Sequence, residues 1–380
     1  MIGTTRRFNL RTNTVDWTRL PSNSAFAPDP SESVIYRLHP ERESKRHIYQ
    51  IGTADPTTAV QAAKLVARDV AGIDVNAGCP KPFSTSGGMG AALLRTPDKL
   101  CSILEALVKE VGTPFEIGIS VKIRLLETPE ETKTLVSRLC ATGITGLTIH
   151  CRTTPMRPRE RAIREQLKMI AATCHEAGVA CLMNGDVTSS DDALLLAEQY
   201  GADGGMIATA AEQNPSCFRR AADGGVATWQ EVVREYVTTA LAVDNRWGNT
   251  KYLLGQMIPG KAPEYRAMSR SKSYSELIRA LALEEVDGGR LVEMASDVDA
   301  ALQIGAPKMT KAERKARNKV AMAETEEANK VAGEKQTSRP SALKRTADEA
   351  GLEDNDNMPR DVARQGGPGS VPEQASVLVI

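Results

Sequence analysis

The sequence predicts an α/β fold: a (β/α)8 TIM barrel that is N-terminally incomplete, followed by a small all-α helical domain and a disordered tail. Short β-rich runs alternate with stretches whose apolar residues recur at i, i+3 and i+4, the pattern of a parallel sheet covered by helices. Each run also ends in polar or glycine residues. The six runs are His47–Gly52, Gly72–Asn76, Ile119–Leu125, Gly146–Cys151, Ala180–Asp186 and Asp203–Thr209.

The polar ends of these runs favour a barrel over an open, doubly wound sheet. In a barrel the C-terminal ends of all strands converge on one face, where the active site is built. In an open sheet only the ends beside the switch point would meet. We therefore expect the polar strand ends to form one site.

Composition divides the chain into four segments. Residues 1–45 contain a Pro-rich polar stretch, PSNSAFAPDPSES, and are expected to be irregular. Residues 46–222 hold the predicted barrel, and residues 228–283 contain helix-like stretches. Residues 288–380 contain no aromatic residue, Cys or His and are rich in Lys, Glu, Asp, Ala, Ser and Pro. Such a composition buries too little apolar surface to order a chain, so a charged, largely disordered tail is expected.

Charge and cysteine content narrow the class of protein. The 48 Lys and Arg residues equal the 48 Asp and Glu residues, so net charge excludes neither an anionic nor a cationic partner. No apolar run approaches the ~20 residues of a membrane helix, so no membrane association is expected. The seven cysteines form no C-x-x-C pair, which argues against disulfides and a metal site and favours a reducing compartment.

The most specific motif is DVNAGCPKPFSTSGGMGAALL, residues 74–94. A strand ends at Asn76, Cys79 follows, and a glycine-rich loop leads into a helix. A thiol has an unperturbed pKa near ~8.5 and can act as a general acid at neutral pH, while a mobile loop beside it can exclude water. The alternative for Cys79 is a buried structural cysteine.

Lys122 lies inside the apolar run ISVKIRL and needs a polar or anionic partner if its side chain points into the barrel. The alternative for Lys122 is a charge on the protein surface.

These motifs, continued by LTIHCRT, MNGDVTS, GADGGMIATAAEQNPSCF and NTKYLLGQM, resemble those of the tRNA-dihydrouridine synthases. The resemblance covers Arg46 to Leu283, and the sequence of the motifs is most similar to that of the eukaryotic branch that modifies position 20 of the D-loop. It implies an FMN-dependent (β/α)8 enzyme that uses NADPH or NADH to reduce uridine in tRNA.

The resemblance also implies roles for individual residues. Cys79 would donate a proton to C5 of the uracil while hydride from reduced FMN reaches C6. Gln50 and Lys122 would contact the isoalloxazine ring, and His150 would lie beside the ring or the phosphate. The remaining expected contacts are those of the ribityl phosphate with Asn184, Gly185, Asp186, Ala208 and Thr209, and those of the target nucleotide with Asn76 and Arg152.

Two departures from the family pattern are visible. The first two barrel strands, the first with a Pro-Met pair, are absent from residues 1–45, hence the expectation of an incomplete barrel. Thr209 stands where an Arg is usual after the eighth strand. A hydroxyl can bond a phosphate but cannot neutralise it, which should weaken FMN affinity.

Two other functions stay open. One is a flavoenzyme of the dihydroorotate or dihydropyrimidine dehydrogenase kind acting on a free base; the other is a catalytically impaired tRNA-binding paralogue or truncated isoform. The helical region and the basic cluster Lys308–Lys319 favour an RNA partner. We expect a monomer in the cytoplasm, with Lys344-Arg345 as a candidate nuclear-import signal.

Overall fold

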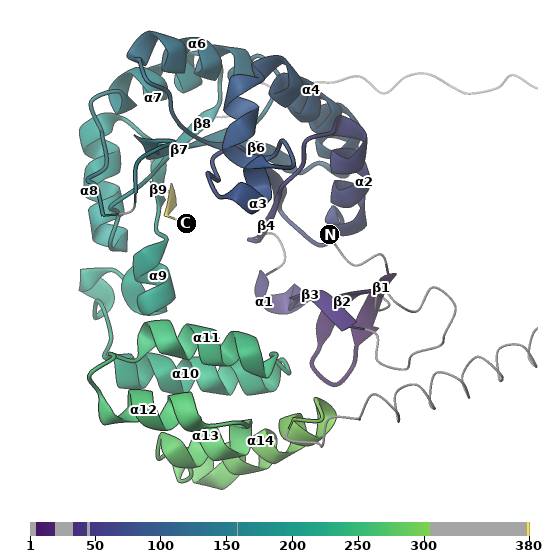
Figure 1. Cartoon of the computed structure of the whole chain (residues 1–380), viewed down its shortest axis with the longest axis vertical. Helices are drawn as coiled ribbons and strands as arrows, with labels where there is room; N and C mark the ends of the chain where they lie inside the picture. Colours follow the sequence, from purple (N-terminus) through teal and green to yellow (C-terminus); the bar gives the residue numbers. More distant parts are fainter. Residues whose placement is uncertain (1–4, 20–32, 44–45, 158, 305–377, 380) are drawn as a thin grey trace, which may run out of the picture. The chain divides into compact units, whose positions relative to one another are not determined.

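The computed structural model describes residues 5–19, 33–43, 46–157, 159–304 and 378–379. Its largest element is a curled parallel sheet whose strands pair in the order in which they occur in the chain (Figure 1). All six predicted strands are confirmed. They are β4 (Ile48–Ile51), β5 (Gly72–Asn76), β6 (Gly118–Leu125), β7 (Gly146–Thr153), β8 (Ala180–Asn184) and β9 (Gly204–Met206).

Helices follow the strands and lie along the outer side of the sheet (Figure 1). They are α2 (Pro56–Val66), α4 (Pro97–Leu107), α6 (Pro129–Cys140), α7 (Leu167–Glu176) and α8 (Ser190–Tyr200). Local sequence explains where they begin: Asp55 caps α2 by accepting the Thr58 N–H, and Thr128 forms a capping box with Glu131 at α6. The fold is the α/β, incomplete barrel that the sequence predicts.

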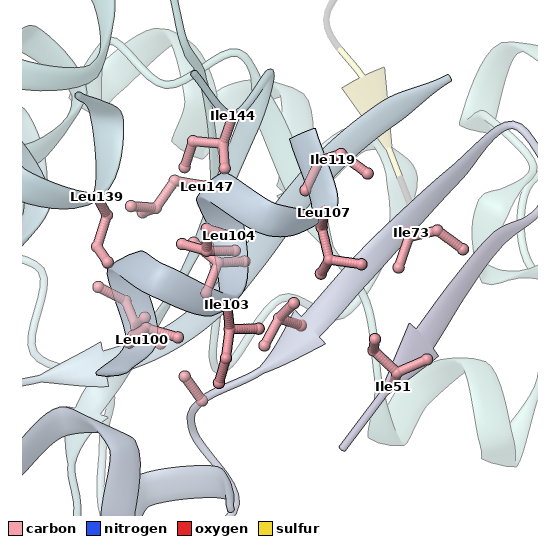
Figure 2. Packing of buried hydrophobic residues seen from close by; sticks show 14 of the residues in the cluster. Ile51, Ile73, Leu100, Ile103, Leu104, Leu107, Ile119, Leu139, Ile144 and Leu147 are labelled. Carbon is pink, nitrogen blue, oxygen red and sulfur yellow. The ribbon is translucent and has the colours of Figure 1, made fainter. Parts of the chain in front are cut away.

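The core lies between these helices and the sheet (Figure 2). Leu100, Ile103, Leu104 and Leu107 form one face of α4 and have no exposed surface. They recur at helical spacing, so a single face of α4 is buried against the strands. Strand residues complete this cluster, among them Ile51, Ile73, Ile119 and Leu147.

The N-terminal residues differ from expectation. Instead of an irregular segment, β1 (Thr5–Asn9), β2 (Thr14–Arg19) and β3 (Ser33–Leu38) form a three-stranded antiparallel sheet separate from the parallel one. Val15 and Trp17 of β2 are buried, and the Trp17 indole N–H donates to the carbonyl of Leu65 at 2.9 Å. The prediction was wrong because it gave more weight to the Pro-rich stretch than to TVDWT, a run with β-branched and aromatic residues.

The C-terminal helices extend further than predicted. Five helices share an apolar core: α10 (Trp229–Ala242), α11 (Trp247–Met257), α12 (Pro263–Arg270), α13 (Tyr274–Ala280) and α14 (Arg290–Ala301). Leu291, Ala295 and Val298 of α14 are buried in it, although α14 lies in the segment expected to be tail. Three apolar residues at i, i+4 and i+7 are too weak a signal for a helix when the surface that covers them is not known.

The rest of the predicted tail, residues 305–377, lies outside the described residues, including the basic cluster. At the end of the chain β10 (Leu378–Val379) pairs in parallel with β9. No helix in the described ranges is long and apolar enough to cross a membrane. The short helical segments are α1 (Pro40–Glu43), α3 (Pro82–Thr85), α5 (Thr113–Phe115), α9 (Thr209–Gln213), η1 (Gly90–Arg95), η2 (Val108–Gly112), η3 (Pro215–Phe218), η4 (Ala221–Asp223) and η5 (Val286–Gly289).

Candidate active site

The turn after β5 holds Cys79 at the C-terminal end of the sheet. The side-chain carbonyl of Asn76 accepts the N–H groups of Gly78 and Cys79, at 3.1 and 3.0 Å. The Cys79 carbonyl in turn accepts the N–H of Ala91 at 2.9 Å, which fastens the turn to η1. The half-buried Cys79 is therefore fixed through its backbone on both sides.

A hydrogen-bonded network of side chains runs across the neighbouring strands beneath this turn. Gln50 of β4 donates through Nε2 to Asp74 Oδ2 at 2.8 Å and accepts through Oε1 from Asn76 Nδ2 at 3.0 Å. Ser120 of β6 donates to the other Asp74 oxygen at 2.7 Å. The structure thus joins Gln50, Asn76 and Cys79, which the sequence placed in one site.

Lys122 of β6 lies opposite Asn76 in the strand register. Burial lowers the pKa of its ammonium group to about 8, although the negative charge of Asp74 acts in the opposite direction. Asp74 is therefore an anionic partner of the kind expected for a lysine inside an apolar strand. Burial raises the pKa of Asp74, and its hydrogen bonds from Gln50 and Ser120 and the charge of Lys122 oppose that rise.

His150 of β7 is neutral at physiological pH. Burial, together with the positive charges of Lys122, Arg124 and Arg152, lowers its pKa to about 3. Its Nε2 lies 3.1 Å from Arg152 Nη1. Because a guanidinium can only donate, Nε2 is the acceptor, and the proton of the neutral ring is on Nδ1.

Arg152 and Asp186 form the second part of the site, at the ends of β7 and β8. Arg152 is 4% exposed, pairs with the Asp186 carboxylate and donates to the Glu160 carbonyl at 2.6 Å. The Ala162 N–H donates to Asp186 at 2.7 Å. Burial acts to raise the pKa of Asp186, but this N–H and Arg152 outweigh it, so the pKa is lowered. The expected contact of Arg152 with a nucleotide stays a prediction.

Three further predicted residues lie beside this part. Asn184 donates through Nδ2 to the Met206 carbonyl at 3.0 Å, which links β8 to β9. Ala208 follows β9, and Thr209 is the first residue of α9. The hydrogen bonds described above do not extend to Ala208 or Thr209 within the described residues, so their phosphate contacts stay a prediction.

The residues present fit a flavin phosphate such as FMN. Gly185 has φ +111°, and a Cβ there would lie 3.3 Å from both Arg152 Nη1 and His150 Cδ2, so a glycine is needed for this close approach. Arg164 donates to the Gly185 and Asp186 carbonyls at 2.8 and 3.0 Å. A cavity of about 410 Å³ opens here, lined by Arg159, Glu160, Arg161, Arg164, Asp186, Asp192 and Leu196. Three arginines and three carboxylates thus line this cavity.

Comparison with known proteins decides the family. The model of the family described as "Dihydrouridine synthase (Dus)" matches residues 25–282. The chain belongs to the dihydrouridine synthase family.

Two curated members of the dihydrouridine synthase family are similar over most of this chain. A Schizosaccharomyces pombe protein named tRNA-dihydrouridine(20) synthase [NAD(P)+] is 50% identical over 68% of this chain and 54% of its own length. A Saccharomyces cerevisiae protein of the same name is 43% identical over 76% of this chain and 75% of its own. The chain therefore spans about half of the first relative's length and three quarters of the second's. A crystal structure of DHODH from Eimeria tenella shares 17% identity with a TM-score of 0.32, covering 41% of this chain and 49% of its own.

Four residues of this dihydrouridine synthase site were missed in the sequence: Asp74, Ser120, Arg124 and Arg164. Arg124 donates to the Gly78 carbonyl at 2.7 Å and the Thr153 carbonyl at 2.9 Å, so it links the Cys79 turn to the end of β7. Burial and the nearby charge of Arg152 lower its pKa. Asp74 carried a usable signal, since a carboxylate inside the apolar strand GIDVN is costly to bury without a partner.

Proposed function

We propose that this chain reduces uridine to 5,6-dihydrouridine in tRNA, at position 20 of the D-loop, with FMN as cofactor and NADPH or NADH as reductant. The observation that supports this most directly is the half-buried Cys79, held just after the end of β5, where Lys122 lies opposite Asn76 in the strand register. Membership of the family and the names of the two yeast relatives support the same substrate.

The chemistry requires a hydride and a proton to add across the C5–C6 double bond. FMN, when bound and reduced by NAD(P)H, supplies the hydride that reaches C6. Cys79 donates the proton to C5 as a general acid, and its backbone hydrogen bonds to Asn76 and η1 fix the direction from which the thiol approaches. Two electrons and two hydrogens are thereby added to the base.

Lys122 and His150 have distinct electrostatic roles in this proposal. With a pKa of about 8, Lys122 is mostly protonated at pH 7 and presents positive charge where a reduced flavin is anionic. Neutral His150 donates through Nδ1 without adding a further charge. Gln50, Asn184, Gly185, Asp186, Ala208 and Thr209 would hold the cofactor, and Asn76 and Arg152 the target nucleotide. A monomer in the cytoplasm, with a nuclear fraction, is proposed from the sequence alone.

A second candidate is a tRNA-binding relative with impaired catalysis. Thr209 favours it, because a hydroxyl leaves the phosphate charge uncompensated at that position. Arg164 beside Asp186 favours the active enzyme. An absorbance spectrum of the purified protein separates the two, since a bound flavin absorbs near ~450 nm.

Replacing Cys79 with alanine tests the proposed function. Cys79→Ala should lower dihydrouridine formation by ~10²–10⁴-fold while flavin absorbance and NADPH oxidation persist, because the thiol acts only on the base. Cys101→Ala is the matched control, since Cys101 is also partly buried but lies on α4. Full dihydrouridine formation by Cys79→Ala would rule out its role as the acid.

A further inference from the structure

We propose that Asp74 is a positioning residue for this reduction: its carboxylate sets the orientation of the Gln50 amide, which supports Asn76 and through it the Cys79 turn, and it supplies a negative charge that acts on Lys122. The inference rests on the proposed function for its catalytic consequence. Its structural part, the coupling of Asp74 to Lys122 and to the two amides, does not depend on that function.

Asp74 lies in the middle of β5, the strand next to the edge strand β4, and both of its carboxylate oxygens accept hydrogen bonds. It is 6% exposed, and its strand neighbours in register are Gln50 on β4 and Ser120 on β6. Gln50 Nε2 donates to one oxygen at 2.8 Å and Ser120 Oγ to the other at 2.7 Å. A buried carboxylate needs such donors to offset its lost hydration.

The carboxylate gives the network its direction. An ionised carboxylate can only accept, so it requires the Nε2 end of Gln50 to face it. The Oε1 end of Gln50 then faces Asn76 and accepts from Nδ2 at 3.0 Å. Asn76 is left with Oδ1 toward the turn, where it accepts the N–H groups of Gly78 and Cys79. The carboxylate therefore sets the orientation of the Gln50 amide, and the two backbone N–H groups, which can only donate, require the matching orientation of Asn76.

The same carboxylate acts on Lys122. The charged and titratable groups around Lys122 are Asp74 on β5, Cys79 on the following turn, Arg124 on its own strand, and His150 and Cys151 on β7. Burial and Arg124 lower the pKa of Lys122, and Asp74 is the largest influence that raises it. Removing the charge of Asp74 should lower that pKa further and leave Lys122 less positive at neutral pH.

Asp74→Asn tests both effects because it keeps the shape and removes the charge and the acceptor-only character. Asp203→Asn is the matched control: it makes the same change at a carboxylate that lies 2.8 Å from His175 Nε2 and accepts the Cys181 N–H, neither of which belongs to the network described above. The first measurement uses the cofactor-free chain, with acylation of Lys122 by an N-hydroxysuccinimide ester followed against pH by peptide mass spectrometry. A nearby opposite charge typically shifts a pKa by ~1–3 units, so the acylation midpoint should fall by about one pH unit in Asp74→Asn and stay in place in Asp203→Asn.

The second measurement is dihydrouridine formation in unmodified tRNA by the flavin-loaded enzyme. Asp74→Asn should lower kcat by at least ~10-fold, since a small misplacement of reacting groups is enough for such losses, and Asp203→Asn should retain most of the wild-type kcat. An unchanged Lys122 midpoint, or a wild-type kcat, in a folded Asp74→Asn protein would overturn the proposal. If wild-type protein forms no dihydrouridine, the proposed function fails, while the acylation result still decides the coupling.

A second variant serves if Asp74→Asn does not fold. Gln50→Leu interrupts the network after Asp74 and leaves the carboxylate beside Lys122. The Cys79 turn then loses the amide that orients Asn76, and kcat should fall by at least ~10-fold. A wild-type kcat in Gln50→Leu would overturn the proposal.

Discussion

Replacing Gly90 with alanine should displace Cys79 and lower the activity of the enzyme. Gly90 begins η1 with φ +59°, a left-handed conformation that non-glycine residues adopt at a cost. A Cβ at Gly90 would lie 2.5 Å from the Cys79 carbonyl oxygen, 2.5 Å from Ser84 Oγ and 3.2 Å from Cys79 Cβ. The clash therefore falls on the residue proposed as the acid.

The magnitude follows from two separate costs. The left-handed conformation costs alanine ~1–2 kcal/mol, and forcing an extra carbon into a packed site costs ~1–3 kcal/mol. A carbon–oxygen contact normally lies at ~3.3–3.6 Å, so the Cys79 carbonyl must move by most of an ångström. Displacement of a reacting group by ~1 Å can lower the rate ~10²-fold. We expect the unfolding free energy to fall by ~2–5 kcal/mol and kcat by about two orders of magnitude.

Gly88→Ala provides the matched control. Gly88 also has a positive φ, +74°, but a Cβ there would meet only Ala54 Cβ, at 3.4 Å. This variant should lose ~1–2 kcal/mol of stability and keep most of its activity. Both variants are measured by thermal denaturation and by mass spectrometry of dihydrouridine in tRNA. Equal activity of the two variants would refute the claim that Gly90 is needed to place Cys79.

Two further predictions concern a titration and a buried hydroxyl. The pKa of His150 is about 3 in the folded chain and near ~6.5 in an unfolded one. Between these two pH values the unfolded state therefore binds one more proton than the folded state. The stability of the folded state falls as the pH falls through this range. One proton contributes up to ~1.4 kcal/mol per pH unit to the slope of stability against pH, and His150→Gln should remove part of that slope. Urea unfolding from pH 7 to 5 measures it. An unchanged slope would contradict a buried, neutral imidazole. Tyr274 is fully buried, and its hydroxyl lies 2.6 Å from Thr250 Oγ1 and donates to the Asn245 carbonyl at 2.7 Å. Tyr274→Phe should lower the unfolding free energy by ~1–3 kcal/mol, because the partners of the hydroxyl are left unsatisfied. Tyr252, which is 59% exposed, provides the control, and Tyr252→Phe should cost little stability. Equal losses in the two variants would show that the hydroxyl contacts of Tyr274 do not stabilise the helices.

Much of the fold could be predicted because it depends on neighbours in the chain. Each strand from β4 to β9 is a short β-rich run, and each helix between them is amphipathic. Cys79 and Lys122 became candidate site residues for the same reason: each is a polar residue within or just after an apolar run, Lys122 inside β6 and Cys79 three residues beyond β5. Conversely, β1 to β3 and α14 were missed because their signals are weak until the surface that covers Trp17 or Leu291 is known.

The tertiary structure alone determined which side chains meet. In the sequence, Asp74 stands in one apolar run, and Ser120 and Arg124 stand in another more than forty residues later. The register between β4, β5 and β6 places Gln50, Asp74 and Ser120 side by side, and the turn after β5 brings the Gly78 carbonyl to Arg124. Strand and helix formation is local, and a sequence carries it in its periodicity. Hydrogen-bond partners, pKa shifts and the direction of an amide depend on residues tens of positions apart, and only the pairing of the strands brings these together.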